Sequence, residues 1–338
     1  MTHVPDSSQE TSLALPVVDE ALRSRLVQGM LTVEEHLERE VRSEADFITE
    51  ACRHLLHAGG KRFRPMLVLL ASEAGEGIND DVLTAASVVE LTHLASLYHD
   101  DVMDEAELRR GADSANARWD NHVAILAGDW LFSKSSELTA RLGPEAVRIQ
   151  AETFSRLVEG QILETREPRP GEDLLEHYLR VVGGKTGSLI ATSARYGAMF
   201  SGCSPEVVAA LTGYGERVGV AFQLSDDILD LGSDSDMSGK TPGTDLREGV
   251  PTLPTLMALR SSDPADARLK ELLSAPLTDD ALHAEALHLM REHPSMGEAR
   301  RYVLQLANSA LDLLTVVPDG PVKQALNDFA GLIATRSA

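Results

Sequence analysis

The stretch LASLYHDDVMDE, residues 94–105, decides the fold class because it places three carboxylates inside an apolar helical pattern. Asp100 and Asp104 are four residues apart, so they share one face of a helix, with Asp101 beside them. Three carboxylates within one turn repel one another, and their apolar neighbours reduce their solvation. The stretch therefore predicts a helix that binds a cation.

The same acidic pattern returns in GVAFQLSDDILDLG, residues 219–232. Here Asp226 and Asp230 share a helical face, and Asp227 lies next to them. Two clusters of oxygen ligands suggest hard divalent cations held between two helices, and Mg²⁺ with phosphate oxygens is the natural occupant. The paired acids at residues 80–81 and 279–280 begin helical runs instead, so we expect them to cap helices.

Composition favours packed helices and argues against a nucleic-acid partner. The chain of 338 residues has 31 basic and 53 acidic side chains, a net charge of −22, which argues against nucleic acid as a partner. Its apolar residues are mostly Ala, Leu and Val, which suit packed helices. Two cysteines make neither a disulfide framework nor a zinc site. With no apolar run of membrane-spanning length and no signal sequence, a cytoplasmic location is the default expectation.

Helical periodicity dominates from residue 17 to residue 338, and we expect one all-helical domain there, preceded by a disordered tail at 1–16. We find no alternating strand pairs with hairpin turns. A long polar segment, residues 232–251, is expected to be a loop and to act as a lid. The main helical patterns cover residues 17–42, 44–56, 115–142, 144–164, 174–182, 186–200 and 205–231.

Two basic segments flank the first acidic cluster. GGKRFRP, residues 59–65, puts three cations in a glycine loop that opens a helix, where backbone N–H groups can also reach a phosphate. Arg109 and Arg110 follow the cluster by about one turn. Each segment has an alternative interpretation: the first as a solvated loop, the second as helical pairing with nearby glutamates.

A third basic segment, GGKTG at residues 183–187, resembles part of a phosphate-binding P-loop. Position 179 is Leu179 where that motif needs its first glycine, and the preceding pattern is helical, so we reject a nucleotide-hydrolase function. Lys185 and Thr186 are still good phosphate ligands at an expected helix start. His93, two turns before Asp100, would by itself be interpreted as a hydrogen-bonded core residue.

Taken in order, five segments resemble the trans-isoprenyl diphosphate synthase, or polyprenyl synthetase, family. They are GGKRFRP, HDDVMDEAELRRG, GGKTG, AFQLSDDILD and GKTPGTDL. The resemblance implies an all-α isoprenoid synthase fold, a large helical bundle around a central apolar cavity, and a homodimer. It also implies a Mg²⁺-dependent prenyltransferase that condenses an allylic diphosphate with successive isopentenyl diphosphates, giving an all-trans polyprenyl diphosphate.

The resemblance assigns roles to particular residues. Metal ligands, with three Mg²⁺ ions when substrate is bound, would be Asp100, Asp101, Asp104, Asp226, Asp227 and Asp230, which with Lys185 form the catalytic set. The allylic diphosphate would contact Arg109, Lys185, Thr186, Gln223 and Lys240. Isopentenyl diphosphate would bind Lys61, Arg64, His93 and Arg110, with Arg62 beside them, so that His93 becomes a ligand rather than a core residue.

Product length is expected to depend on residues before the first cluster. Family members with short products carry a bulky aromatic side chain five residues before the first aspartate, where this chain has Ala95. With Thr92 one turn deeper, space remains for a product longer than farnesyl, and a long chain is favoured. Phe132 or Tyr98 would then form a deeper stop or wall. The alternative is that another helix blocks the tunnel early.

Two other functions compete with prenyl elongation. A class I terpene cyclase also uses an aspartate-rich helix, but it does not need GGKRFRP and normally has a different second metal motif. A non-catalytic subunit of a heteromeric prenyl synthase should have lost one cluster, whereas this chain keeps both. Because the product would be apolar, a transient membrane contact during its release is a further expectation.

Overall fold

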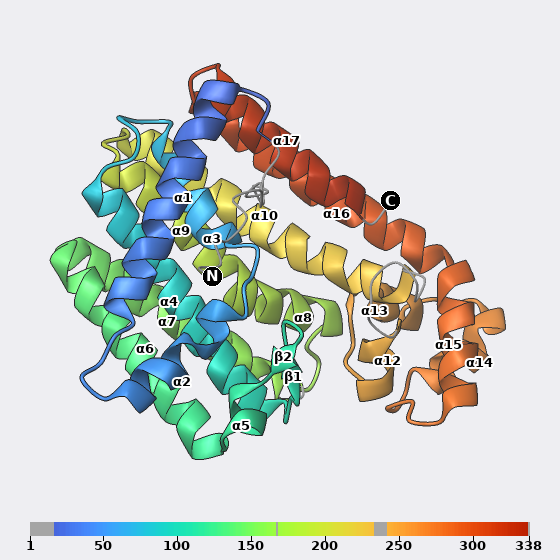
Figure 1. The fold of residues 1–338 in the computed structure, drawn as a ribbon. Coiled ribbons are helices and arrows are strands. Elements are labelled where there is room, and N and C mark those ends of the chain that lie inside the picture. Colours follow the sequence, from blue (N-terminus) through green and yellow to red (C-terminus); the bar gives the residue numbers. More distant parts are fainter. Residues whose placement is uncertain (1–16, 167, 233–241, 337–338) are drawn as a thin grey trace, which may run out of the picture. The chain divides into compact units, whose positions relative to one another are not determined.

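The computed structural model describes residues 17–166, 168–232 and 242–336 (Figure 1). Backbone contacts divide them into two compact units. The first comprises the described residues up to Gln150 with Arg195–Pro205 and Pro318–Ala325, and the second comprises Ala151–Ala194, Glu206–Val317 and residues 326–336. The expected tail at 1–16 lies outside the described residues, and the single domain stays a prediction.

The expected all-α fold is confirmed, and α4 is the centre of the first unit. Helix α4 is buried over most of its length and contacts α1, α3 and α6. Its N-cap is Asn79, whose side chain accepts a hydrogen bond of 2.9 Å from the Val82 amide. The helices of this unit are α1 (Glu20–Glu40), α2 (Asp46–His57), α3 (Phe63–Ser72), α4 (Asp80–Met103), α5 (Ala115–Arg118) and α6 (Asn121–Arg141).

Two details of the first unit differ from expectation. A short hairpin, β1 (Leu108–Arg109) with β2 (Ala112–Asp113), follows the first acidic cluster, although no strand pair was expected. Its turn is Arg110-Gly111, and both residues have positive φ, as a two-residue hairpin turn requires. The helix expected over 115–142 is broken because Asp120 caps α6 by accepting from the Val123 amide at 2.9 Å.

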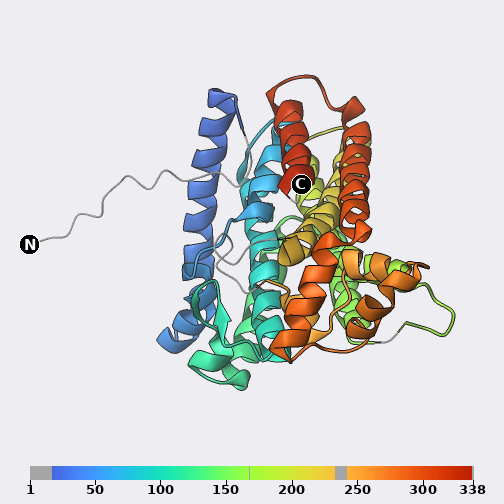
Figure 2. The same cartoon turned by 90° about the vertical axis from the view of Figure 1, so that its right-hand side faces the viewer.

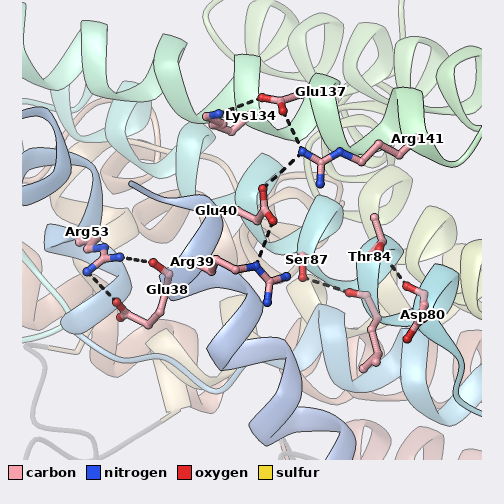
Figure 3. A network of polar contacts seen from close by, with 11 residues as sticks. Glu38, Arg39, Glu40, Arg53, Asp80, Thr84, Ser87, Lys134, Glu137 and Arg141 are labelled. Carbon is pink, nitrogen blue, oxygen red and sulfur yellow. Dashed lines mark hydrogen bonds and ion pairs between the residues drawn. The ribbon is translucent and has the colours of Figure 1, made fainter. Parts of the chain in front are cut away.

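Polar contacts at the surface of the first unit join α1, α2 and α6 (Figure 3). Arg53 pairs with Glu38 at 3.0 Å, and Arg141 reaches Glu137 at 2.8 Å and Glu40 at 3.6 Å. The partners are partly or largely exposed, so water screens these pairs and each contributes at most about 1 kcal/mol. They orient helix ends and carry no catalytic chemistry.

The second unit packs α13 against α8, α15 and α16. Figure 2 shows α16 and α17 as two long helices joined at one end by residues 314–320. The helices and single turns that lie wholly in this unit are α8 (Leu174–Val182), η1 (Gly183–Gly187), α12 (Thr244–Glu248), α13 (Leu253–Leu259), η2 (Pro264–Asp266), α14 (Ala267–Leu272), α15 (Asp280–Glu292), α16 (Pro294–Leu313) and η3 (Leu314–Val316).

Four helices contribute residues to both units: α7 (Pro144–Glu164), α9 (Ser188–Phe200), α10 (Pro205–Gly232) and α17 (Pro321–Arg336). On α7, four apolar side chains, Val147, Phe154, Val158 and Ile162, are between 37% and 53% exposed and recur at helical spacing. Among the described residues, no helix is long and apolar enough to cross a membrane.

The GGKTG segment was expected at a helix start. Instead it forms a π-helical turn, η1, that joins α8 to α9. The reason lies in its glycines, which allow α7 to come close. A Cβ atom on Gly184 would lie 2.8 Å from the Arg156 carbonyl oxygen, and one on Gly160 would lie 2.6 Å from the Lys185 amide nitrogen. Single π turns inside α-helices are frequent at functional sites.

Candidate active site

The first aspartate cluster lies at the carboxyl end of α4. Asp100 and Asp101 belong to its last turn, and Asp104 is the C-cap residue. This end of a helix carries the negative pole of the macrodipole, so three carboxylates are unfavourable there. The folded chain therefore concentrates negative charge at a point where only a cation can stabilise it.

Asp101 is fully buried and receives one cation from the chain itself. Both Nε and Nη2 of Arg109 lie 2.6 Å from Asp101 Oδ1. The second carboxylate oxygen, Oδ2, is buried and has no hydrogen-bond partner among the described residues. Burial raises the pKa of Asp101, although the hydrogen bond from Arg109 opposes this shift. An unpartnered buried oxygen is costly, and it is an available ligand for a hard cation.

The GGKRFRP segment begins as a loop and opens α3, as expected, with Arg62 as the N-cap and Phe63 as the first helical residue. Lys61 is exposed, whereas the Arg62 guanidinium is directed into the protein. Arg62 donates to Glu34 at 2.7 Å and to Glu90 at 2.9 Å, and also to the carbonyls of Leu56 and Gly59. These bonds occupy all three guanidinium nitrogens, so Arg62 holds the loop in place.

Arg64, Arg110 and His93 form a half-buried basic cluster. No ion pair joins Arg64 or Arg110 to a carboxylate within the described part of the chain, and the Nε of Arg64 is buried without a partner. Burial lowers the pKa of Arg64 to about 10. Burial, followed by the charges of Arg64 and Arg110, also lowers the pKa of His93 well below its ordinary value. This excess of positive charge favours binding of an anion.

Gly60 lets Arg110 take its place in this cluster. The Arg110 guanidinium donates to the carbonyls of Leu55, at 3.2 Å, and Gly59. A Cβ atom on Gly60 would lie only 2.7 Å from the guanidinium carbon, and the φ of Gly60 is +129°. A side chain at this position would strain the backbone and displace Arg110.

The second aspartate cluster lies in the last two turns of α10, and all three residues are helical, whereas Asp104 of the first cluster is a C-cap residue. Its central residue, Asp227, is buried, but its hydrogen-bond donors are neutral. The Tyr178 hydroxyl donates to Oδ2, and Gln223 Nε2 donates to Oδ1 at 3.1 Å. Burial raises the pKa of Asp227 to about 6, and the two hydrogen bonds oppose this rise.

The outer carboxylates of the second cluster have different partners. Asp230 accepts from the backbone amides of Thr244 and Asp245, each at 3.3 Å. Asp226 forms an ion pair of 3.1 Å with Nη2 of Arg336, near the end of α17. These contacts fix the cluster from two directions, by the segment that leads into α12 and by α17.

A cavity of about 600 Å³ opens beside Asp227 in the second unit. Lys185 lines it and forms a 2.7 Å ion pair with Glu164. Thr186 donates to Gln223 at 3.3 Å, which links the π turn to the cluster. The structure thus brings Lys185, Thr186 and Gln223 to the Asp227 cavity, whereas Lys240 lies outside the described residues.

The donor sets of both clusters fit Mg²⁺. Within the described ranges, no group of three or more His, Cys, Asp or Glu side chains is arranged to hold a metal ion by itself. That is compatible with Mg²⁺, which usually keeps several waters and binds one or two carboxylates together with substrate phosphates. The unpartnered Oδ2 of Asp101 and the excess of carboxylates at two helix ends are the features that such an ion would satisfy.

Sequence reasoning missed three residues of the second cluster: Tyr178, Glu164 and Arg336. Tyr178 lies one turn before η1 and contacts Asp227 from 49 residues away. The only sequence signal for it was helical spacing, because Tyr178 and Lys185 are seven residues apart and share a face. No local pattern marks Arg336, whose partner follows from the packing of α17.

The residues expected to set product length lie in the first unit. Ala95 is fully buried, and its carbonyl oxygen is 3.1 Å from the place of a Gly128 Cβ atom, so α4 and α6 approach closely there. The Thr92 hydroxyl bonds Ser135 at 2.8 Å and Gln150 at 2.7 Å. Phe132 lies on α6 with its ring 5.6 Å from His99.

Tyr98 is directed towards α2. Its hydroxyl donates to the Ala51 carbonyl at 2.5 Å and accepts from the Leu55 amide at 3.2 Å. Those two backbone groups are ordinary partners one helical turn apart, so the hydroxyl enters the hydrogen-bond ladder of α2. Tyr98 therefore anchors α4 to α2.

Comparison with known proteins gives a consistent result. Residues 45–290 match the family model described as polyprenyl synthetase. The nonaprenyl diphosphate synthase of Mycobacterium tuberculosis is 52% identical over 88% of this chain and 89% of its own length. Heptaprenyl diphosphate synthase component 2 of Geobacillus stearothermophilus is 38% identical over 94% of this chain and 98% of its own length.

A solved structure is similar as well. It is the geranylgeranyl pyrophosphate synthase of Corynebacterium glutamicum, complexed with calcium and isoprenyl diphosphate. Its TM-score is 0.85 at 46% identity, with 95% of this chain and 99% of that chain covered. The chain belongs to the polyprenyl synthetase family. It is therefore an enzyme of isoprenoid biosynthesis, a prenyltransferase with the all-α fold of its family.

Proposed function

We propose that this protein extends an allylic diphosphate with successive isopentenyl diphosphates, in a Mg²⁺-dependent reaction that yields an all-trans polyprenyl diphosphate and diphosphate. The observation that carries the proposal is the pair of aspartate clusters at two helix ends, each beside cationic side chains that a diphosphate would satisfy. The family relationship supplies the reaction, and these charges supply the physical reason for it.

The six clustered aspartates would hold the metal ions. Asp101 can offer its unpartnered Oδ2, and Asp226 and Asp230 present carboxylates at the end of α10. When bound, Mg²⁺ ions neutralise and orient the leaving diphosphate, an effect of several kcal/mol on bond ionisation. We propose three ions per loaded site, as the family resemblance implies.

Arg109, Lys185, Thr186 and Gln223 would bind the allylic diphosphate, with Lys240 as a further expected ligand. Arg109 and Lys185 are each held by a carboxylate, Asp101 and Glu164, before substrate arrives. Each cation is therefore already positioned, and it can donate to a diphosphate oxygen when its carboxylate partner takes up another charge. The chain thus stabilises charge that grows on the leaving group.

Isopentenyl diphosphate would bind the basic cluster of Arg64, Arg110 and His93, with Lys61 at its edge. Among the described residues, Arg64 and Arg110 form no ion pair with a carboxylate, so this cluster needs no metal to attract an anion. Arg62 acts indirectly by fixing the loop. We propose that the alkene attacks the allylic cation and that the released proton goes to the departing diphosphate, so that no protein nucleophile takes part.

We propose that the product is longer than farnesyl diphosphate and that a long chain is favoured. Small side chains at Ala95 and Thr92 support this, as does the name of the nonaprenyl relative. Because α4 and α6 approach closely at Ala95, an Ala95→Phe variant needs a thermal-unfolding control. A folded variant whose products shorten towards C15 or C20 supports a tunnel past Ala95, and unchanged products contradict it.

We also propose that the enzyme works as a homodimer. The exposed apolar stripe on α7 is the kind of surface that a second copy covers. The name of the heptaprenyl component 2 relative favours a second candidate, a heteromeric synthase. Sedimentation of the purified chain distinguishes a dimer from a monomer that waits for another subunit.

The direct test mixes purified protein with radiolabelled isopentenyl diphosphate, an allylic primer and Mg²⁺. Extracted products are separated by chromatography against chain-length standards. Label in polyprenyl products longer than C15, dependent on the primer and abolished by a chelator, is the expected result. No product from the protein alone would overturn independent elongation, and hydrocarbon formed without isopentenyl diphosphate would indicate a terpene cyclase.

A further inference from the structure

Helix α17 runs parallel to α10, and two hydrogen bonds at different heights along the helices join them. The Tyr214 hydroxyl donates to the Leu326 carbonyl at 2.7 Å, and Ser225 donates to the Ile333 carbonyl at 3.3 Å. Ser225 directly precedes the second aspartate cluster. The contacts therefore bring the last turn of α17 beside the carboxylates that are proposed to bind metal.

Arg336 completes this attachment through two different contacts. Its guanidinium carbon lies 5.0 Å from the centre of the Phe222 ring, one turn before Asp226 on α10. Its Nη2 lies 3.1 Å from Asp226 Oδ1. A cation held by both a ring face and a carboxylate is oriented better than one held by the carboxylate alone.

The negative charge of Asp226 can be balanced in two mutually exclusive ways. Without metal, Arg336 offsets the negative charge of Asp226 at the unfavourable end of α10. A divalent cation that binds the same Oδ1 replaces the single positive charge of the guanidinium by a stronger one. Asp226 is 41% exposed and Arg336 27% exposed, so the pair is weak enough to open.

From this geometry we infer that Arg336 is the resident counter-ion of Asp226, which a divalent cation displaces, so that metal loading of the second cluster releases the last turn of α17. The inference rests on the proposed metal-binding role of Asp226. It assigns a task to Arg336 that the carboxylates cannot perform, because it couples metal occupancy to the position of a helix end.

The first measurement is Mn²⁺ affinity of the substrate-free protein, by calorimetry or electron paramagnetic resonance. In Arg336→Gln, the metal no longer competes with a guanidinium, and affinity should tighten about twofold to fivefold. Arg336→Lys keeps the charge and should stay near wild type. Lys323→Gln is the matched control, because Lys323 lies on the same helix but forms its ion pair with Asp319.

The second measurement is hydrogen exchange of the amides in residues 330–336. Added Mn²⁺ should speed their exchange in wild-type protein and leave Arg336→Gln, which already lacks the contact, unchanged. A loss of packing alone would speed exchange but would not tighten metal binding. Phe222→Leu removes the ring contact and should tighten Mn²⁺ binding less than Arg336→Gln does.

The outcomes separate this inference from the proposed function. If Asp226→Asn weakens Mn²⁺ binding while Arg336→Gln leaves it unchanged or weaker, the metal role stands and the counter-ion role is overturned. If wild-type protein binds no Mn²⁺, with or without diphosphate, both fail. Tightening in Arg336→Gln, with Lys323→Gln at wild-type affinity, supports the inference.

Discussion

The two aspartate clusters share a sequence pattern, and each lies near the carboxyl end of a helix, but the chain compensates their charge differently. In the first, the buried Asp101 faces a cation, Arg109, at 2.6 Å. In the second, the buried Asp227 receives hydrogen bonds from the neutral donors Tyr178 and Gln223, and the cation Arg336 pairs with its more exposed neighbour Asp226. A repeated sequence pattern therefore does not imply that the same kinds of group balance its charge.

The difference has a consequence for how each cluster accepts a metal ion. A cation at Asp101 competes with a half-buried ion pair, and the released Arg109 becomes available to the substrate. At Asp227 the hydrogen bonds from Tyr178 and Gln223 can persist while the carboxylate stays charged, because they favour the ionised form. We expect metal binding to release Arg109 at the first cluster, and we expect metal affinity to depend on pH at the second cluster.

The largest expected effect is shared by the two clusters. Asp100→Ala or Asp226→Ala removes a proposed metal ligand and should lower kcat by about a thousandfold, since metal stabilisation of a leaving group amounts to several kcal/mol. Steady-state incorporation of isopentenyl diphosphate measures it. Asp81→Ala is the control, because Asp81 is an exposed acid at the opposite end of α4. Near-normal turnover in either cluster variant contradicts the assignment for that cluster.

The next effect should distinguish the clusters by stability. Arg109→Gln leaves Asp101 charged and buried, which should cost about 3 kcal/mol in the free energy of unfolding. Tyr178→Phe removes one hydrogen bond to a carboxylate and should cost only about 1–2 kcal/mol. Urea unfolding without metal measures both, with Arg268→Gln as an exposed control whose change should stay below about 1 kcal/mol.

Adding Asp101→Asn should recover part of the loss in Arg109→Gln, because the unpaired charge is then gone. Equal losses in Arg109→Gln and Tyr178→Phe would remove the distinction between a cluster balanced by a cation and one balanced by neutral donors. A larger loss of unfolding free energy in Tyr178→Phe than in Arg109→Gln would reverse the distinction.

A third effect concerns pH and the second cluster. Burial raises the pKa of Asp227 to about 6 from an unfolded value near 3.9, so the fold favours its neutral form. The stability contributed by that proton is present below the unfolded pKa and is lost as pH rises through about 6. Metal binding needs the charged form, so Mn²⁺ affinity of this cluster should fall as pH drops through about 6.

Tyr178→Phe sharpens this prediction. Without the hydrogen bond from Tyr178 the pKa of Asp227 rises further, so the loss of Mn²⁺ affinity should begin at a higher pH than in wild type. Titration between pH 5 and 8 measures the midpoint. Tyr196→Phe is the matched control, because Tyr196 is also buried but donates to the Ala146 carbonyl. A midpoint that stays put or moves lower in Tyr178→Phe would show that Tyr178 does not tune Asp227.

The smallest effect concerns the basic cluster near the first aspartates. Burial and then Arg64 lower the pKa of His93, so its ring is neutral in the free protein. The stability contributed by this neutral ring is present above the unfolded pKa and is lost as pH falls through the folded pKa. A bound diphosphate should raise that pKa and cause proton uptake.

Calorimetric titration with pyrophosphate in buffers of different ionisation enthalpy measures the uptake. His93→Gln should abolish it, whereas His122→Gln, a change at an exposed histidine, should not. Uptake that persists without His93 would place the titrating group elsewhere.

Local sequence patterns predicted the elements that local chemistry determines. The bounds of α7 and α8 were predicted to the residue, because apolar periodicity and polar boundaries mark both ends. The aspartate clusters were placed on helices for the same reason. The GGKTG segment was misplaced at a helix start because its glycines serve a close crossing with α7 rather than a turn.

The missed residues depend on contacts that no local pattern contains. Tyr178 meets Asp227, and Arg336 meets Asp226, only through the packing of separate helices. Arg62 looked like a phosphate ligand from its position in a basic loop, but Glu34 and Glu90 lie on two other helices that sequence alone could not bring together.

The most direct test of the central claim is Mn²⁺ stoichiometry in the presence of an unreactive allylic thiodiphosphate. If both aspartate clusters bind metal for one substrate, wild-type protein should bind three ions, and Asp100→Ala and Asp226→Ala should each lose at least one. Asp81→Ala should keep all three. Unchanged stoichiometry in either cluster variant would contradict the claim that both clusters hold the metal ions of one reaction.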